Sequence, residues 1–296
     1  MKSIMYHYIR NKNTEFPYYN SLSINKFQQQ LKRFARKGIV SNYDDLFFEN
    51  KKKFLLTFDD SLKDHLYAAE LLKKNDSIGL FFVPTLPLKN NDILDVHKVH
   101  LILGKVKSLD AFSELEKYLS NNKIKNYFSK IEKKKYQSAY NQQKNDDFQN
   151  KFKKLMNYYG NISLKHKILN HLMKKFDIDI KSQDYYLNKK ELRYLSSLGM
   201  IIGSHGESHT LLSRLSYKKQ YKEITNSKFF LEKIINKEVN TFCYPYGRKM
   251  SYNKDTLKIL RKLKFQFAYS VEYRDIKKSD IKKRPLELPR YDCNQF

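Results

Sequence analysis

The chain has 296 residues, enough for one large domain or two small ones, and its content of 41% hydrophobic and 15% aromatic residues argues against disorder. Two cysteines, Cys243 and Cys293, are too few and too far apart for a disulfide framework or a thiolate metal site. The formal net charge of +27 would suit nucleic acid or an anionic membrane surface. Only ten of the 58 basic residues are arginine, however, and the lysines are spread along the whole chain, so we expect no nucleic-acid partner.

The sequence offers no segment that would carry the chain across a membrane. Its first residues, MKSIMYHYIR, lack the apolar core of a signal peptide, and no stretch approaches the roughly 20 apolar residues of a membrane span. We therefore expect a cytoplasmic protein, with peripheral contact to a membrane surface through lysines left open. The sequence gives no indication of the oligomeric state.

Short apolar runs alternate with segments of helical periodicity, which is typical of an α/β protein. The predicted strands span residues 3–8, 54–58, 79–83, 200–202, 241–244 and 265–270. The predicted helices span residues 24–36, 62–74, 189–198, 217–235 and 253–263. Residues 88–186 show no strong strand, and we predict a helical insertion there, within a single domain of residues 1–296. The insertion could be a lid, a substrate platform or a spacer.

The stretch KFLLTFDDSLKDH ends a predicted strand on two adjacent carboxylates, Asp59 and Asp60. Neighbouring negative charges repel each other, so the pair indicates a metal ligand, a catalytic base or both. Farther along, MIIGSHGESH ends another strand and presents His205 and His209, four residues apart, a separation that suits one zinc ion. Two surface histidines are the alternative.

The two stretches together support a metal site more strongly than either does alone, because the carboxyl ends of parallel strands gather at one rim of a sheet or barrel. Two imidazoles and one carboxylate make a three-ligand zinc site with an open position for water. The second carboxylate is then available as a base. A third stretch, NTFCYPYGRKMSYN, ends a strand in a stiff aromatic turn, where the backbone N–H of Tyr246 could face a developing oxyanion. An ordinary strand-terminating turn is the alternative.

The motifs TFDD, SHGESH and CYPYG, in this order, resemble the first three motifs of the polysaccharide deacetylases, carbohydrate esterase family 4. The resemblance implies an α/β fold of a distorted (β/α) barrel with fewer than eight strands. It also implies Asp59 as the base, Tyr246 as the oxyanion donor, and a metal held by Asp60, His205 and His209. Zn²⁺ is the expected metal, although Co²⁺ or Ni²⁺ would accept the same ligands.

The chain departs from the family pattern at several positions. Ser61 stands where the family commonly has Gly, and Gly206 stands where it has Ser or Thr. The late motifs that supply the general acid are missing, since the chain has no Trp and no His after His209. The strand SIMYHY looks like the last family motif moved to the front, which is similar to the permuted poly-N-acetylglucosamine deacetylase group. We therefore expect His7 to be the general acid.

Near the end of the chain, LELPRYDCN places Arg290 after an apolar stretch. We expect Arg290 to orient or pair with Asp59, replacing the arginine that usually opens the third family motif. A surface ion pair that contributes nothing measurable is the alternative.

Several aromatic side chains at strand ends are placed to contact a sugar ring. We expect substrate contacts from Tyr6, Tyr244 and Pro245. The stretch LDVHKVH adds His97 and His100, for which a second metal site is conceivable. We instead expect these histidines to pack or form hydrogen bonds where the insertion joins the barrel, with His97 near the substrate.

These features predict a metal-dependent hydrolase that removes N-acetyl groups from an amino-sugar-containing glycan or glycan precursor. Substrate choice is expected to depend on the insertion, and polymer, lipid-linked glycan and nucleotide sugar all stay open. One alternative is a catalytically silent carbohydrate-binding barrel, suggested by the altered motifs. The other is a basic polyanion-binding protein, suggested by the net charge.

Overall fold

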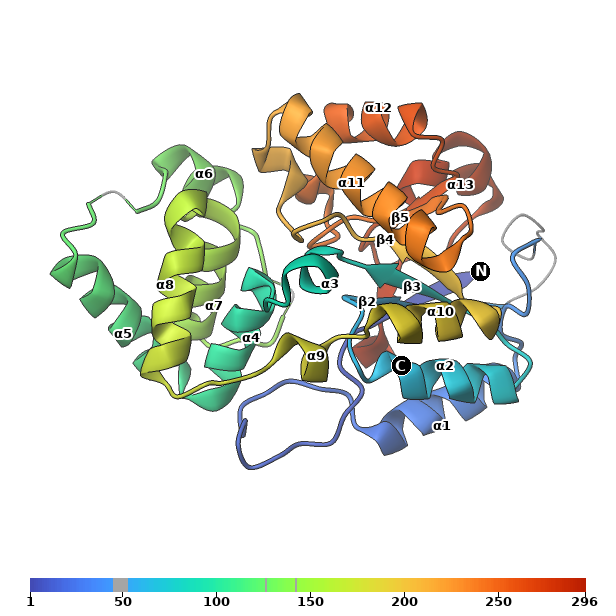
Figure 1. The fold of residues 1–296 in the computed structure, drawn as a ribbon, viewed down its shortest axis with the longest axis horizontal. Helices are drawn as coiled ribbons and strands as arrows, with labels where there is room; N and C mark the ends of the chain where they lie inside the picture. Colours follow the sequence, from blue (N-terminus) through green and yellow to red (C-terminus); the bar gives the residue numbers. More distant parts are fainter. Residues whose placement is uncertain (45–52, 126, 142) are drawn as a thin grey trace. The chain divides into compact units, whose positions relative to one another are not determined.

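The computed structural model describes residues 1–44, 53–125, 127–141 and 143–296 (Figure 1). The described chain divides into two compact units. The first contains Met1–Asn11, Ser21–Asp92 and Ser182–Phe296, and the second contains Lys12–Asn20 and Ile93–Lys181. The main segment of the second unit falls within the insertion predicted at residues 88–186, of which residues 126 and 142 lie outside the described residues.

The first unit contains all seven strands of the described chain, and every pair of neighbours is parallel. The strand order is β6-β5-β4-β3-β2-β1-β7. The strands are β1 (Lys2–Tyr6), β2 (Phe54–Asp59), β3 (Gly79–Val83), β4 (Ile201–Ser204), β5 (Thr241–Cys243), β6 (Phe267–Tyr269) and β7 (Tyr291–Asp292). The first six confirm the predicted strands, whereas β7, only two residues long, was not predicted.

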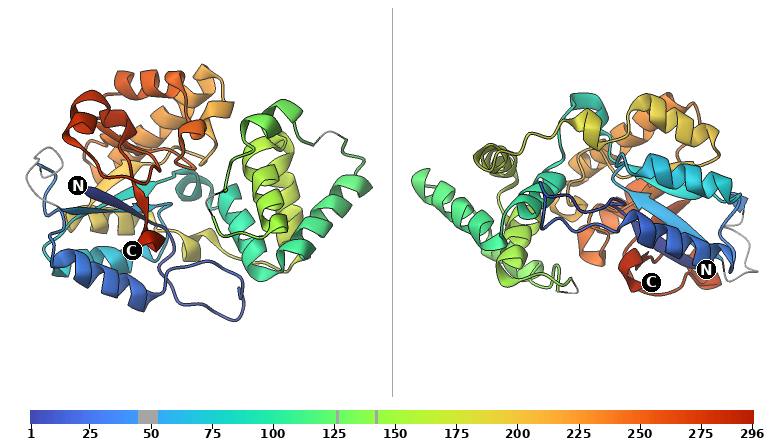
Figure 2. Two further views of the ribbon diagram at one scale, coloured as in Figure 1. Left: turned by 180° about the vertical axis from the view of Figure 1, so that it is seen from behind. Right: turned by 90° about the horizontal axis from the view of Figure 1, so that it is seen from below.

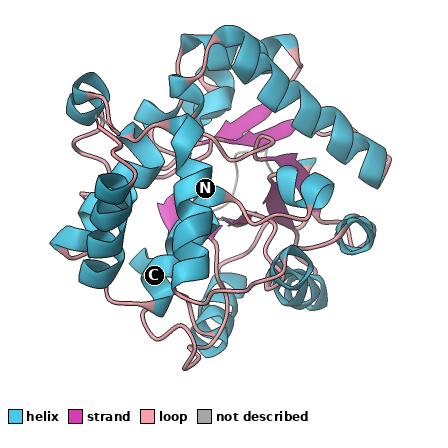
Figure 3. Ribbon diagram, turned by 60° about the vertical axis from the view of Figure 1, so that its left-hand side comes forward, coloured by secondary structure: helices cyan, strands magenta, loops and turns pink. Residues whose placement is uncertain are grey.

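One short segment near residue 290 bridges the two edges of this sheet. Leu288 pairs with Tyr269 of β6, while β7 pairs with β1. The backbone of Leu288 also donates to Ala268 and accepts from Ser270. The sheet is therefore curled, with its strands surrounded by helices (Figure 3), which confirms the predicted distorted (β/α) barrel with fewer than eight strands.

Helices cover the outside of the sheet in chain order. Helix α10 (Lys189–Ser197) packs against α2 (His65–Lys74) on one side and α11 (Tyr217–Ile235) on the other, and α11 packs against α12 (Lys254–Lys262). The remaining helices of this unit are α1 (Ile24–Ala35), α3 (Leu86–Asn90), α9 (Ser182–Tyr185) and α13 (Lys278–Lys283). Helix α1 is typical: Ser23 caps its first turn, and Phe27, Leu31 and Phe34 form a buried stripe at helical spacing.

An aromatic layer fills the space between the strands and α1. The ring of Phe58 stacks on Tyr6 at 5.4 Å and on Phe81 at 4.6 Å between centroids. Phe27 of α1 meets both Tyr6 and Phe58 edge-on. Because side chains alternate along a strand, this outward-facing layer leaves the neighbouring residues, Thr57 and Asp59, on the opposite face of β2.

The described residues of the second unit's main segment are mostly helical. Its helices are α4 (Asp95–Lys105), α5 (Ser108–Asn121), α6 (Lys130–Lys135), α7 (Asp147–Lys154), which continues into a single π-helical turn, and α8 (Ile162–Lys175). Helix α8 packs against α4 and α5, and α7 packs against α5 (Figure 2). No helix among the described residues is both long and apolar enough to cross a membrane.

Candidate active site

The strand register brings the predicted site residues to one end of the barrel. Tyr6 is level with Phe58, Asp59 with Phe82, and Val83 with Ser204. The residues that follow these strands therefore meet at the carboxyl edge of the sheet. Gly203 allows β4 to pack closely against the side chains of β3 and β5, because a Cβ there would lie 2.6 Å from both Phe82 and the Thr241 hydroxyl.

Asp60, His205 and His209 form a buried group that we call the Asp60 cluster. The Oδ1 atom of Asp60 lies 3.5 Å from Nε2 of His205 and 3.4 Å from Nε2 of His209. Donors bound to one tetrahedral ion at about 2.0 to 2.1 Å are separated by about 3.4 Å, so these distances suit a shared divalent cation. The convergence expected from the strand ends is confirmed.

The hydrogen bonding of His205 orients its ring for this use. Its Nδ1 donates to the backbone carbonyl of Cys243 at 2.8 Å, which leaves the lone pair on Nε2, facing Asp60. Burial lowers the pKa of His205, although both Asp59 and Asp60 oppose the shift. The neutral imidazole is the form that binds metals.

Asp59 lies beside the Asp60 cluster in a different electrostatic setting. Arg290 donates from Nη1 to Oδ1 at 2.7 Å and from Nη2 to Oδ2 at 2.8 Å, which confirms the predicted pairing. Burial alone would raise the pKa of Asp59, but the Arg290 guanidinium outweighs it and lowers the pKa to about 2. We call these residues the Asp59–Arg290 pair.

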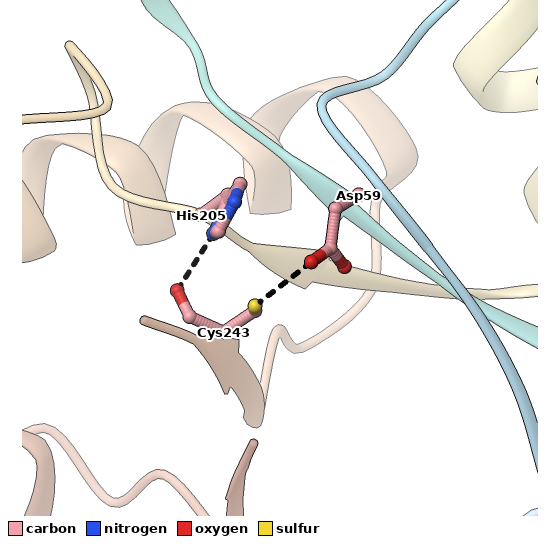
Figure 4. Close-up of side chains that lie close together, drawn as sticks. All are labelled: Asp59, His205 and Cys243. Atoms are coloured by element: carbon pink, nitrogen blue, oxygen red, sulfur yellow. Dashed lines mark hydrogen bonds between the residues drawn. The ribbon is translucent and has the colours of Figure 1, made fainter. Parts of the chain in front are cut away.

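Arg290 is fully buried inside the barrel and has further partners there. Its Nη1 also donates to the hydroxyl of Thr57 at 3.0 Å, and its Nη2 lies 2.9 Å from Sγ of Cys243. Cys243 in turn approaches Oδ2 of Asp59 at 3.4 Å (Figure 4). Asp59, His205 and Cys243 are close enough to hold a metal. The positive charge of Arg290 beside Asp59 and Cys243 makes that set unsuitable, so the Asp60 cluster is the better cation site.

His7 lies at the outer side of the two acids, with its side chain about one third exposed. Its Nε2 is 4.0 Å from Oδ2 of Asp59 and 3.8 Å from Oδ2 of Asp60. The His7 backbone is held by His65, whose Nε2 lies 2.9 Å from the His7 carbonyl oxygen. His65 is fully buried, and this burial lowers its pKa to about 4.

Left-handed backbone conformations concentrate around the site. Asp60 has a φ of 81°, Ser61 of 56°, His209 of 54° and Tyr246 of 65°. Such angles are costly for residues with a Cβ and are found where the surrounding structure enforces them, often at functional sites. Ser61 accordingly occupies a position where glycine would adopt the same backbone without strain. Tyr246 is partly buried, and its ring lies 5.0 Å from that of His209.

The burial of Tyr6 and Tyr244 contradicts the sugar stacking predicted for them, because stacking on a sugar needs an exposed face. Tyr6 is fully buried in the aromatic layer and donates to Oε1 of Gln30. Tyr244 is 1% exposed and stacks on Tyr252. Pro245 is also buried. His97 is fully buried within the second unit, which agrees with the packing expected for it.

Sequence reasoning missed three functional neighbours in the first unit. Cys243 contacts the Asp59–Arg290 pair, His65 holds the His7 carbonyl, and Glu223 accepts hydrogen bonds from the loop between His205 and His209. The side chains of Glu223 and His65 belong to helices, and only the packing of those helices on the sheet brings them here. The one available signal was His65, five residues after the end of the TFDD motif.

The barrel with ionisable groups at the carboxyl ends of its strands defines the class of fold. A match to the sequence profile of one family identifies the family within that class. The polysaccharide deacetylase profile matches residues 114–268, just over half of the chain. The chain belongs to the polysaccharide deacetylase family. The matched residues include His205, His209 and Tyr246, whereas Asp59 and Asp60 precede them.

Known relatives agree with this assignment. YxkH of Bacillus subtilis (strain 168), a protein named for the same family, is 27% identical over 88 residues, which are 30% of this chain and 30% of YxkH. The Streptococcus pyogenes deacetylase PplD, solved in complex with acetate, superposes with a TM-score of 0.61 at 18% identity, covering 99% of this chain and 91% of PplD.

Two further structures share the fold. BC0361, a polysaccharide deacetylase from Bacillus cereus, gives a TM-score of 0.57 at 15% identity, covering 99% of this chain and 64% of BC0361. IcaB from Ammonifex degensii gives a TM-score of 0.53 at 13% identity, covering 91% of this chain and 82% of IcaB. At these identities the structural likeness establishes the fold.

Proposed function

We propose that this protein is a metal-dependent carbohydrate N-deacetylase, which hydrolyses the acetamide of an N-acetylated amino sugar to acetate and a free amine. The observation that carries the proposal is that two adjacent acids have different partners. Asp60 shares one oxygen with two imidazoles at 3.4 to 3.5 Å, while Asp59 is held by Arg290. Membership of the polysaccharide deacetylase family supports the substrate class.

The Asp60 cluster would hold the cation, with Zn²⁺ expected and Co²⁺ or Ni²⁺ compatible with the same donors. When bound, such an ion supplies Lewis acidity for the amide carbonyl and acidifies water. The remaining chemistry belongs to the side chains. His205 contributes to it indirectly, since its bond to the Cys243 carbonyl fixes the ring nitrogen that faces Asp60.

Asp59 would accept the proton of the attacking water. With a pKa of about 2 it is ionised throughout the physiological pH range, and Arg290 fixes the orientation of its carboxylate. A carboxylate this acidic is a weak base in bulk water, so it depends on a water that has itself been made acidic. This dependence is why the base and the cation ligand are adjacent residues.

His7 would donate the proton to the departing amine nitrogen. It is the exposed member of the group, and its Nε2 lies within 4.0 Å of both acids, close to the proposed base. Donation by His7 completes the balance, since water supplies a hydroxyl to the acetyl group and a proton to the amine. The backbone N–H of Tyr246 is the proposed donor to the oxyanion.

The test is to measure zinc content and acetate release from N-acetylglucosamine oligomers on the same purified samples. Wild type is expected to hold near one Zn²⁺ per chain and to release acetate. The His205→Ala, His209→Ala double variant should lose both, because two of three ligands are gone. Asp59→Asn is the matched control, expected to keep the metal and lose acetate release by roughly 10² to 10⁴-fold.

Two other outcomes would favour the alternatives. Metal binding without acetate release from any N-acetylated amino sugar would support a silent carbohydrate-binding barrel. An absence of metal after zinc addition, together with polyanion binding that weakens steeply with salt and survives Asp59→Asn, would favour the polyanion-binding protein.

A further inference from the structure

The loop between His205 and His209 ends in a backbone conformation that His209 does not favour. Gly206 has a φ of 75° and His209 a φ of 54°, so the backbone enters the left-handed region twice within four residues. Glycine adopts this conformation freely, but it is unfavourable for His209, which carries a Cβ. Something outside the loop must therefore hold it in place.

Glu223, on the face of α11 that packs against β4, makes the most extensive contact with this loop. Its Oε2 accepts the backbone N–H of Glu207 at 3.1 Å and of Ser208 at 2.9 Å. Its Oε1 accepts the Ser208 hydroxyl at 2.8 Å. One carboxylate thus receives three hydrogen bonds from the two central residues of the loop, and both of its oxygens are used.

The same face of α11 supplies two further contacts at helical spacing. Asn226 donates from Nδ2 to the Glu207 carboxylate at 2.9 Å, and the hydroxyls of Ser227 and Ser204 lie 2.8 Å apart. Residues 223, 226 and 227 stand three and four positions apart, so they share one side of the helix. Of the three, Glu223 alone binds the loop backbone.

We propose that Glu223 is a positioning residue that pre-organises His205 and His209 for the cation and so sets the metal affinity of the site. The inference rests on the proposed function, which makes these histidines metal ligands. Glu223 fixes the loop through its N–H groups rather than through the imidazoles, so it acts on both ligands at once. Without it, binding the cation would have to order the loop as well as coordinate the ion.

The experiment measures the Zn²⁺ dissociation constant of the whole purified chain by competition with a chromogenic chelator. Glu223→Ala leaves two loop N–H groups without their acceptor, and we expect its Zn²⁺ affinity to fall roughly 10- to 100-fold, as for other residues that orient metal ligands. Glu223→Gln should stay close to wild type, because its amide oxygen can accept both N–H groups and its NH₂ can donate to the Ser208 hydroxyl.

Glu232 of α11 provides the matched control. It accepts the backbone N–H of Val239 at 3.0 Å and pairs with Lys228, so Glu232→Ala removes similar interactions from the same helix away from the loop. This variant should keep the wild-type Zn²⁺ affinity even if its unfolding midpoint falls. The visible absorption of the Co²⁺-loaded proteins should change for Glu223→Ala and stay unchanged for Glu232→Ala.

Each remaining outcome tests the positioning role of Glu223 or the proposed function. Equal Zn²⁺ affinity in wild type and Glu223→Ala, or equal losses in Glu223→Ala and Glu232→Ala, would overturn the positioning role while wild-type acetate release kept the proposed function intact. A wild type that binds no Zn²⁺ would overturn both. If Glu223→Ala does not fold, Glu223→Asp replaces it, since the shorter side chain keeps the charge and withdraws the carboxylate from the loop.

Discussion

The two halves of the site differ in the positive charge that balances each acid. For Asp59 the protein itself supplies that charge, through two short hydrogen bonds from Arg290 inside the barrel. The Asp60 cluster brings one carboxylate oxygen and two imidazole nitrogens to 3.4 to 3.5 Å, a spacing that a shared cation would satisfy. Two neighbouring residues of one motif therefore depend on different partners, and this can be tested on each half separately.

The largest effect on stability is expected from breaking the Asp59–Arg290 pair. Arg290→Met leaves the Asp59 charge buried without its counter-ion, so we expect the free energy of unfolding to fall by about 3 to 5 kcal/mol. Urea unfolding monitored by circular dichroism measures this change. If the halves are independent, the folded fraction of the variant should still bind Zn²⁺.

The double variant Asp59→Asn, Arg290→Met is the control for this prediction. It removes both buried charges, so it should recover part of the stability lost in Arg290→Met. If the double variant is less stable than Arg290→Met, the loss comes from the shape of Arg290 in the barrel rather than from its charge.

A smaller effect is expected from acid. Because Arg290 holds the pKa of Asp59 near 2, below its ordinary value of 3.8, the unfolded chain binds this proton more readily than the folded chain. The stabilisation is fully present above pH 4 and is lost as the pH falls towards 2, with a total of about 2 kcal/mol. Urea unfolding of wild type and Asp59→Asn across this range isolates the contribution. Parallel curves for the two proteins would contradict it.

The smallest effect is expected at Ser61, which directly follows the two acids. Its φ of 56° is costly for serine, and among the described atoms its buried hydroxyl has no hydrogen-bond partner. Ser61→Gly removes both penalties and should raise the free energy of unfolding by about 0.5 to 1 kcal/mol. Ser197→Gly in α10 is the control and should lower it, since glycine is unfavourable in a helix. A loss of stability in Ser61→Gly would show that the strain at this position is offset elsewhere.

The strands and helices of the barrel followed from local patterns, whereas β7 did not. Runs such as FLLTF and GLFFV are buried on both faces, so they are apolar and long enough to recognise. Strand β7 has two residues, both only partly buried, and it forms because Leu288 and Tyr291 reach opposite edges of the sheet. That arrangement depends on the curling of the whole sheet, which no local pattern contains.

At the site, the charged and metal-binding residues that come together could be predicted from the sequence. The residues expected to contact a sugar could not. The approach of His205 and His209 to Asp60 followed from their positions at strand ends, and the pairing of Arg290 with Asp59 followed from the family resemblance, in which an arginine opens the third motif. The sugar contacts assigned to Tyr6 and Tyr244 failed because a tyrosine suits a buried layer as well as an exposed face. Which of the two it joins depends on how α1 and the residues around 286 pack, as the bonds to Gln30 and Leu286 illustrate.

The segment that carries Arg290 also covers both edges of the curled sheet. Unpaired strand edges are templates for association with other chains, and β1 and β6 would both present one if this segment detached. The same local opening would withdraw the guanidinium from Asp59. The segment is therefore expected to protect the sheet edges from aggregation and to hold the proposed base in position at the same time, and to lose both when it opens.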